Sequence, residues 1–161
     1  MQLGESFVGD GVHAAHVNTM VGSREGPVGH AWATALATPS LRHAPFVVVM
    51  QPGLPVKPYT LFVNKAPIES DEHGELTWGA AQAGVAGGVA RALRDGVVEL
   101  NNVLIAAVWV NPKALMVNDV FENNREATYN ALLVGARDEP TETDVLGAID
   151  DEWNAYFRPR R

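Results

Sequence analysis

The chain has 161 residues, of which 47% are hydrophobic and 19% charged, and its formal net charge is −7 at pH 7. This length predicts one domain, residues 1–161, that is large enough to bury a core. The negative charge argues against a nucleic-acid partner, and the absence of cysteine excludes disulfides and thiolate metal sites. No apolar stretch is long enough to cross a bilayer, and no signal-peptide pattern opens the chain. We therefore expect a cytoplasmic protein with no membrane partner.

Hydrophobic patterning predicts an alternation of strands and helices along the chain. Strands are expected at residues 3–8, 12–21, 46–50, 59–65 and 102–110. Helices are expected at residues 25–38, 75–95 and 118–134, the last with Asn118 as N-cap and Gly135 as its stop. Thr141 and Asp144 have the spacing of a capping box that opens a further helix. In that helix, apolar residues repeat at helical spacing at Val145, Ile149, Trp153 and Tyr156.

A candidate binding residue stands at the end of the predicted strand 59–65. Pro55 and Pro58 make a rigid entry to this apolar strand, which ends abruptly in Asn64 and Lys65. Ligand groups in α/β folds are often bound at such strand ends. Lys65 is therefore a candidate ligand contact; the alternative is a solvated lysine at a strand end.

The predicted strand 12–21 carries a candidate proton donor. Side chains alternate across a strand, so His16, Asn18 and Met20 share one face, and His13 does not share it. His16 and Asn18 can therefore contact one ligand together. A histidine titrates near neutral pH and can serve as a general acid when a pocket surrounds it. The alternative is a histidine with a structural hydrogen bond.

Residues 79–90 are unusually rich in small side chains for a helix, and Gln82 is the one polar side chain among them. Glycine costs helix stability relative to alanine, so this composition indicates close packing or the approach of a ligand. The alternative is a helix that lies tightly on a sheet, with Gln82 at its exposed edge.

A group of acidic residues with one histidine precedes this helix: Asp71, Glu72, His73 and Glu75. These residue types can bind a metal, but acidic side chains are also favoured at a helix N-terminus. We assign no metal here, and no role to His30 or His43.

In their order and spacing, these segments resemble the formaldehyde-activating enzyme family. The resemblance covers residues 3–135, whereas residues 140–161 form a divergent C-terminal helix and tail. The matching stretches are Gly4-Glu5, Val8-Gly9-Asp10-Gly11, Ala15-His16, Leu54-Pro55, Lys57-Pro58, Thr60-Leu61, Asn64-Lys65, Gly79, Ala81-Gln82, Gly84, Asn124 and Glu126-Ala127-Thr128. The resemblance implies an α/β fold (α+β, two layers) with a mixed sheet, helices on one face and a left-handed βαβ crossover, an exception to the usual handedness. It also implies a homopentamer.

The resemblance implies a lyase-type reaction, the condensation of formaldehyde with tetrahydromethanopterin to the methylene derivative and water. The reduced pterin is the co-substrate, it binds between subunits, and no metal or other bound cofactor takes part. The reaction belongs to one-carbon metabolism and formaldehyde detoxification. By position, His16 is the implied proton donor. The implied pterin contacts are Asn18, Val47, Lys65, Pro67 and Gln82.

Three of these positions depart from the family pattern, and three classes of function stay open. Asn18 replaces an aspartate, Pro67 replaces a threonine, and Val47 replaces the usual leucine. An amide cannot hold a negative charge, and proline has neither the hydroxyl nor a backbone donor. The protein is expected to be a formaldehyde-condensing lyase. The alternatives are a pterin- or aldehyde-binding protein without efficient catalysis, and a paralogue that acts on another small molecule, such as a folate-like one.

Overall fold

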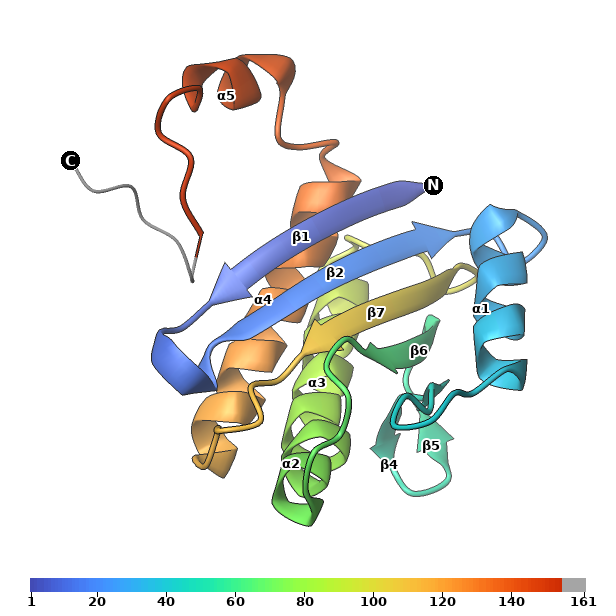
Figure 1. Cartoon of the computed structure of the whole chain (residues 1–161). Coiled ribbons are helices and arrows are strands. Elements are labelled where there is room, and N and C mark those ends of the chain that lie inside the picture. The colour runs from blue at the N-terminus through green and yellow to red at the C-terminus, as the bar shows by residue number, and fades with distance from the viewer. Residues whose placement is uncertain (155–161) are drawn as a thin grey trace.

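A computed structural model describes residues 1–154, and a five-stranded mixed sheet in the order β1-β2-β7-β6-β3 lies at its centre (Figure 1). Strands β6 and β7 run parallel, and the other neighbouring pairs of this sheet run antiparallel. A second sheet pairs β4 with β5. The strands are β1 (Gln2–Val8), β2 (Ala15–Gly22), β3 (Phe46–Val47), β4 (Val49–Gln51), β5 (Leu54–Pro55), β6 (Tyr59–Asn64) and β7 (Val103–Trp109). The predicted α+β class with a mixed sheet is confirmed.

Two long helices, α3 (Gln82–Arg94) and α4 (Val117–Ala136), form the layer behind the sheet (Figure 1). Helix α4 packs against β1, β2 and α3. The main core lies between these helices and the sheet. Its fully buried members include Val17, Phe62, Val85, Leu104, Val108 and Leu132. The central strands β2 and β7 contribute alternate side chains to this core, as the period of two of a strand requires.

The helix α1 (Pro27–Ala37) packs on the opposite face of the sheet. Val28 forms a second buried cluster there with Leu61 and Ile105, which alternate along their strands with the core residues Phe62 and Leu104. The prediction of helices on one face is therefore correct for α3 and α4 and wrong for α1. Leu61 and Ile105 are apolar residues of the second face, and α1 shields them from solvent.

Close packing between α3 and α4 accounts for two glycines of the small-residue helix. A Cβ added at Gly84 would lie 2.4 Å from the carbonyl oxygen of Phe121, and one at Gly88 would lie 2.6 Å from that of Arg125. Side chains at these positions would push the two helices apart. Close packing, one of the two interpretations of this composition, therefore occurs within a single chain.

Two strand boundaries differ from the predicted ones. Strand β2 begins at Ala15 because Gly11–His13 forms a short 3-10 turn ahead of it. The predicted strand 46–50 is divided between β3 and β4 at Val48. This residue donates its N–H to Thr60 of the main sheet and accepts a hydrogen bond from Val56. The chain leaves the large sheet at this point and enters the small one.

The bounds of two predicted helices also differ. The helical region expected from residue 75 begins earlier with α2 (Asp71–Glu75), whose N-cap Ser70 accepts a hydrogen bond from the N–H of His73. A π-helical turn, η2 (Leu76–Ala81), connects α2 with α3. Helix α4 is capped by Met116 rather than Asn118, and it continues through Gly135, which packs against the backbone of Leu3.

The last described helix, α5 (Glu142–Gly147), projects beyond the C-terminal end of α4 (Figure 1). Its predicted capping box between Thr141 and Asp144 is confirmed. The helix ends at Gly147, so Ile149 and Trp153 do not belong to it, and Tyr156 lies outside the described residues. Strands β6 and β7 with α2, η2 and α3 form the βαβ unit, whose handedness stays a prediction. No helix within residues 1–154 is long and apolar enough to span a bilayer.

We predict that Gly84→Ala lowers the free energy of unfolding by about 1–3 kcal/mol, because the added methyl overpacks the contact with α4. The matched control is Gly79→Ala, whose Cβ would meet no atom within 4 Å. That variant is expected to be neutral or stabilised by up to about 1 kcal/mol, since alanine favours the helix. Urea unfolding followed by circular dichroism measures both, and equal stabilities would contradict the packing argument.

Candidate functional site

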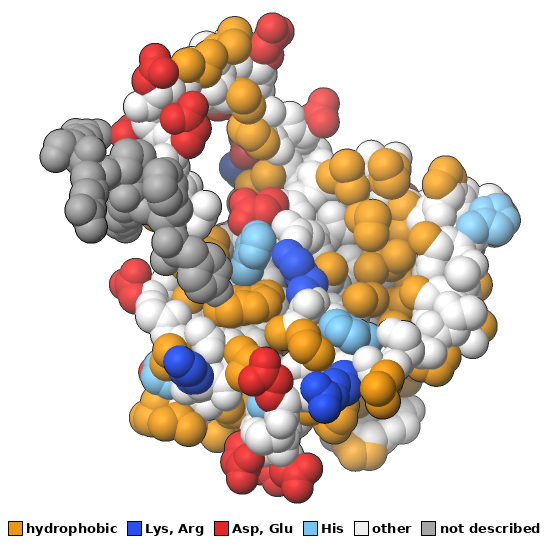
Figure 2. Space-filling view, viewed as in Figure 1, with side chains coloured by type: hydrophobic (Ala, Val, Ile, Leu, Met, Phe, Trp, Pro, Cys, Tyr) orange, Lys and Arg blue, Asp and Glu red, His pale blue; other side chains and the backbone are white. Residues whose placement is uncertain are grey.

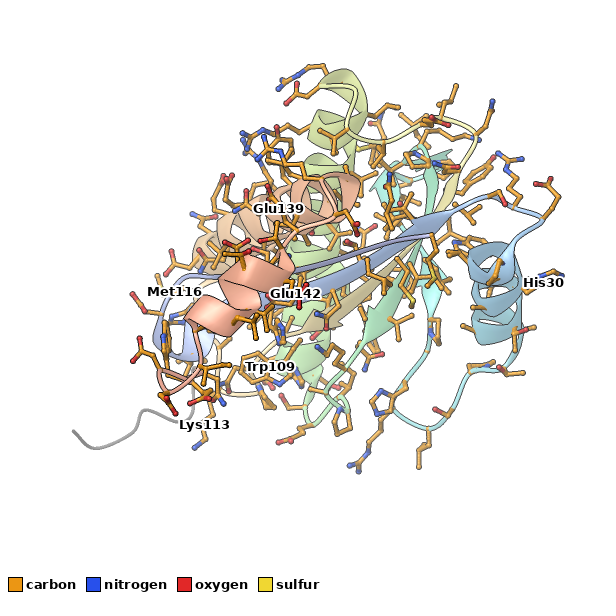
Figure 3. All side chains as sticks on the ribbon, turned by 90° about the horizontal axis from the view of Figure 1, so that it is seen from above. His30, Trp109, Lys113, Met116, Glu139 and Glu142 are labelled. Atoms are coloured by element: carbon orange, nitrogen blue, oxygen red, sulfur yellow. The ribbon has the colours of Figure 1, made fainter. Side chains whose placement is uncertain are left out.

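Within residues 1–154, no helix packs on the second face of the sheet at the end away from α1, and polar side chains gather there (Figure 2). Strand register places His16 opposite Phe7 of β1 and Trp109 of β7, and places Asn18 opposite Glu5 and Ala107. Figure 2 shows basic, acidic and histidine side chains close to one another on this face, with hydrophobic side chains around them. Figure 3 shows Trp109 well away from α1 and its labelled His30.

Lys65 and Asn18 meet across the central strand. The backbone N–H of Lys65 donates to the carbonyl of Val108 over 2.8 Å, which holds the residue beside the end of β7. Its Nζ donates to Oδ1 of Asn18 over 2.5 Å. Ala107 lies between the strands that carry these two residues, and its methyl group is small enough to let the lysine pass. Asn18 and Lys65, both implied pterin contacts, therefore meet within a single chain.

His16 is held from the neighbouring edge strand. Its Nε2 lies 2.9 Å from Oε1 of Glu5, which is a diagonal neighbour across the β1–β2 pair. The ring of Phe7 lies beside the imidazole, with 6.1 Å between the ring centroids. The side chain of His16 is 34% exposed and that of Glu5 is 59% exposed, so solvent and a ligand can reach both.

Burial lowers the pKa of His16, and the positive charge of Lys65 lowers it further, whereas Glu5 acts in the opposite direction. Burial also lowers the pKa of Lys65, again against the effect of Glu5. A histidine pKa below its usual value makes the imidazolium a stronger acid, and it reduces the protonated fraction at neutral pH. The site thus combines a candidate proton donor, His16, with a cation, Lys65, and the carboxylate of Glu5 acts on both.

A hollow of about 460 Å³ adjoins these residues and extends past β1 to the end of α4. This volume is within the range of small-molecule sites. Its lining comprises Leu3, Gly4, Glu5, Asn18, Thr19, Met20, Ala107, Val134, Glu139 and Pro140. Figure 3 labels Glu139 where the chain leaves α4. The hollow gives a small organic ligand access to Asn18 and Glu5.

The other three residues implied as pterin contacts are carried by other elements than β2. Gln82 begins α3 in the helical layer, and its Oε1 accepts a hydrogen bond of 2.6 Å from the N–H of Val49. Its side chain is buried, so the exposed-edge interpretation of Gln82 is wrong. Val47 lies on the edge strand β3, where it pairs with Leu61, and Pro67 is exposed in the loop that follows Lys65.

Asn64 of the strand-end motif and His73 of the acidic group have structural roles. Asn64 is buried, and its Nδ2 donates to the carbonyls of Arg42 and Ala66. His73 is also buried, with Nε2 3.1 Å from the carbonyl of Val110. Asp71 and Glu72 occupy the first turn of α2, as the helix-dipole interpretation predicts.

Glu5 is the site residue to which sequence reasoning gave no role. It was part of a matching motif, and Leu3, Glu5 and Phe7 occupy every second position along β1. This spacing shows that Glu5 shares a face with two apolar residues. The residue of β2 that lies opposite Glu5, however, depends on the register of the two strands. The pairing of Glu5 with Asn18, and hence its reach to His16, appears only in the folded chain.

Comparisons with known proteins give the family of the chain. The model of the formaldehyde-activating enzyme family matches residues 3–157. Among curated relatives, the "Bifunctional enzyme Fae/Hps" of Methanococcoides burtonii is 38% identical over 136 residues, which are 82% of this chain and 34% of that protein. The protein of the same name from Archaeoglobus fulgidus is 31% identical over 159 residues, 96% of this chain and 40% of that protein.

The chain therefore spans well under half the length of these curated relatives. The match to the family, in contrast, extends over almost the whole chain and includes every residue of the polar group on the open sheet face. The chain belongs to the formaldehyde-activating enzyme family.

Proposed function

We propose that this protein is an enzyme that condenses formaldehyde with a reduced pterin, tetrahydromethanopterin, to the methylene derivative and water. The reaction would serve one-carbon metabolism and formaldehyde detoxification, and the name of the matched family, formaldehyde-activating enzyme, supports formaldehyde as the substrate. The observation that carries the proposal is the convergence of His16 with the Asn18–Lys65 pair on the open face of the sheet. This group supplies a proton donor next to polar groups that can orient a ligand.

The chemistry needs one acid. A pterin nitrogen adds to the carbonyl carbon of formaldehyde and gives a carbinolamine. His16 donates a proton to the carbinolamine oxygen, so the carbon–oxygen bond breaks and water leaves, and an iminium forms. The second pterin nitrogen adds to this carbon and releases its proton, which restores the imidazolium. General acid catalysis of this kind contributes about 100- to 10,000-fold.

Lys65 and Asn18 would position the pterin, a contribution that comes mainly from orientation. Gln82 would contribute through its amide nitrogen, because its Oε1 already accepts from Val49. Within one chain Gln82 lies in the helical layer, so we propose that it completes the pterin site of a neighbouring subunit in a homopentamer. Val47 and Pro67 are proposed as further pterin contacts.

A second candidate function is a pterin- or aldehyde-binding protein without efficient catalysis. The observation that favours it is the amide at position 18. Lys65 Nζ donates to a neutral oxygen there, and a carboxylate would accept a stronger, charge-assisted hydrogen bond. Proline at position 67 removes a backbone donor from the same strand end. The two functions differ in turnover rather than in ligand.

We predict that His16→Ala lowers the catalysed turnover by about 100-fold or more, because the proton donor is lost, and leaves pterin affinity nearly unchanged. The measurement is methylene-pterin formation above the spontaneous rate, with affinity determined separately by calorimetry. Turnover equal to that of wild type would reduce His16 to a structural residue.

We predict that Asn18→Asp raises the rate of condensation or the affinity by roughly tenfold, since a charge-assisted hydrogen bond to Lys65 or the ligand replaces a neutral one. The control is Asn101→Asp, which adds the same charge at an exposed residue just before β7. Both variants and wild type are assayed with tetrahydromethanopterin and with tetrahydrofolate. If neither wild type nor Asn18→Asp exceeds the background with either pterin while the protein stays folded, the binding-protein function replaces the enzyme.

We predict a homopentamer, with a mass five times that of the 17.3 kDa chain. The prediction rests on the family resemblance alone. The glycines of α3 do not add to it, because Gly84 and Gly88 already serve packing within the chain. Light scattering at micromolar protein concentration measures the mass. A monomer at this concentration would contradict the proposed site between subunits.

A further inference from the structure

We propose that Glu5 is the positioning residue of His16: its carboxylate holds Nε2–H, so that Nδ1 is the nitrogen that delivers the proton to the substrate. The inference rests on the function proposed above and deepens it. Its geometric basis is the distance of 2.9 Å between His16 Nε2 and Glu5 Oε1. No role in the reaction follows for Glu5 from the family resemblance, in which it appears only as part of a motif.

The backbone that carries Glu5 is firmly placed. Seven consecutive residues of β1, from Gln2 to Val8, pair with β2, and Glu5 lies at the centre of this register. Next to it, Gly4 lies directly on α4, where an added Cβ would be 1.8 Å from the carbonyl oxygen of Ala131. Strand pairing on one side and helix contact behind therefore fix the point from which the carboxylate reaches His16.

The contact selects one tautomer of the imidazole. A carboxylate only accepts hydrogen bonds, so Nε2 keeps its proton in both the neutral and the charged form of His16. The proton that His16 gains and loses is then the one on Nδ1. The arrangement follows the logic of catalytic triads, in which a carboxylate on one ring nitrogen orients the other nitrogen toward the reacting atoms.

The contact also sets how much imidazolium is present. Among the described residues, the charged groups that act on His16 are Glu5 from β1 and Lys65 from the end of β6; Phe7 and Trp109 flank it across the sheet. Burial and Lys65 both lower the pKa of His16, and Glu5 alone raises it. Without this carboxylate, less of the acid form would exist at neutral pH.

The test is Glu5→Gln in the full chain, which keeps the shape of the side chain and removes its charge. NMR titration of His16 without substrate, assigned by comparison with His16→Ala, is expected to give a lower pKa than wild type. Lys65→Gln, examined by titration only, is expected to raise that pKa. Glu122→Gln removes an exposed carboxylate on α4 and is expected to leave the His16 titration unchanged.

Turnover gives the second readout. A general acid loses activity as pH rises through its pKa, so in Glu5→Gln the decline of kcat is expected to begin at lower pH. At neutral pH we expect kcat to fall by about tenfold, the factor for replacing a charge-assisted hydrogen bond with a neutral one, while KM stays within about threefold. A loss that arose from general destabilisation would not move the pH dependence in this way.

Three results would distinguish a failure of the role proposed for Glu5 from a failure of the proposed function. An unchanged His16 titration in Glu5→Gln overturns the proposal. So does a shifted titration in an active enzyme whose kcat and pH profile stay those of wild type. If the titration shifts but wild type catalyses no condensation, the proposed function fails and Glu5 has no proton transfer to assist, although its pairing with His16 stands.

Discussion

The alternation of β2 between a helix-covered face and an open face is the constraint on which the site depends. Ala15, Val17 and Val21 point into the core beneath α3 and α4 and are almost completely buried. His16 and Asn18 must then point to the other face. A slip of one residue in the register would bury both polar side chains and expose the core residues. The hydrophobic effect that fixes the strand therefore also fixes the position of His16, the proposed proton donor.

The charges on the open face are balanced through Glu5. The partner of Lys65 at position 18 is the neutral amide of Asn18 rather than a carboxylate. Glu5 opposes the effect of burial on the pKa of both Lys65 and His16. Asn18→Asp would add a second acid next to this pair. That carboxylate would strengthen the contact with Lys65 and also favour the imidazolium of His16. The amide at position 18 thus increases the importance of Glu5 for the protonation of the site.

Sequence reasoning predicted the features that depend on local pattern. The shared face of His16 and Asn18 and the position of Lys65 at a strand end follow from strand period and apolar runs, and the structure has both. It could not predict contacts that depend on pairing between distant segments. The cover of the second face by α1 and the burial of Gln82 against Val49 are set by tertiary packing. The reach of Glu5 to His16 depends on a register that no single strand encodes.

The packing of α3 has a consequence for the location of the proposed pterin site. Gly84 and Gly88 let α3 lie close to α4, which keeps α3 within the layer behind the sheet. Gln82 begins this helix and is held there by its hydrogen bond with Val49. His16 lies on the opposite face of the sheet, separated from that layer by the core residues of β2. This placement favours the proposal that the two side chains contact one pterin from different copies of the chain, and catalysis would then require assembly.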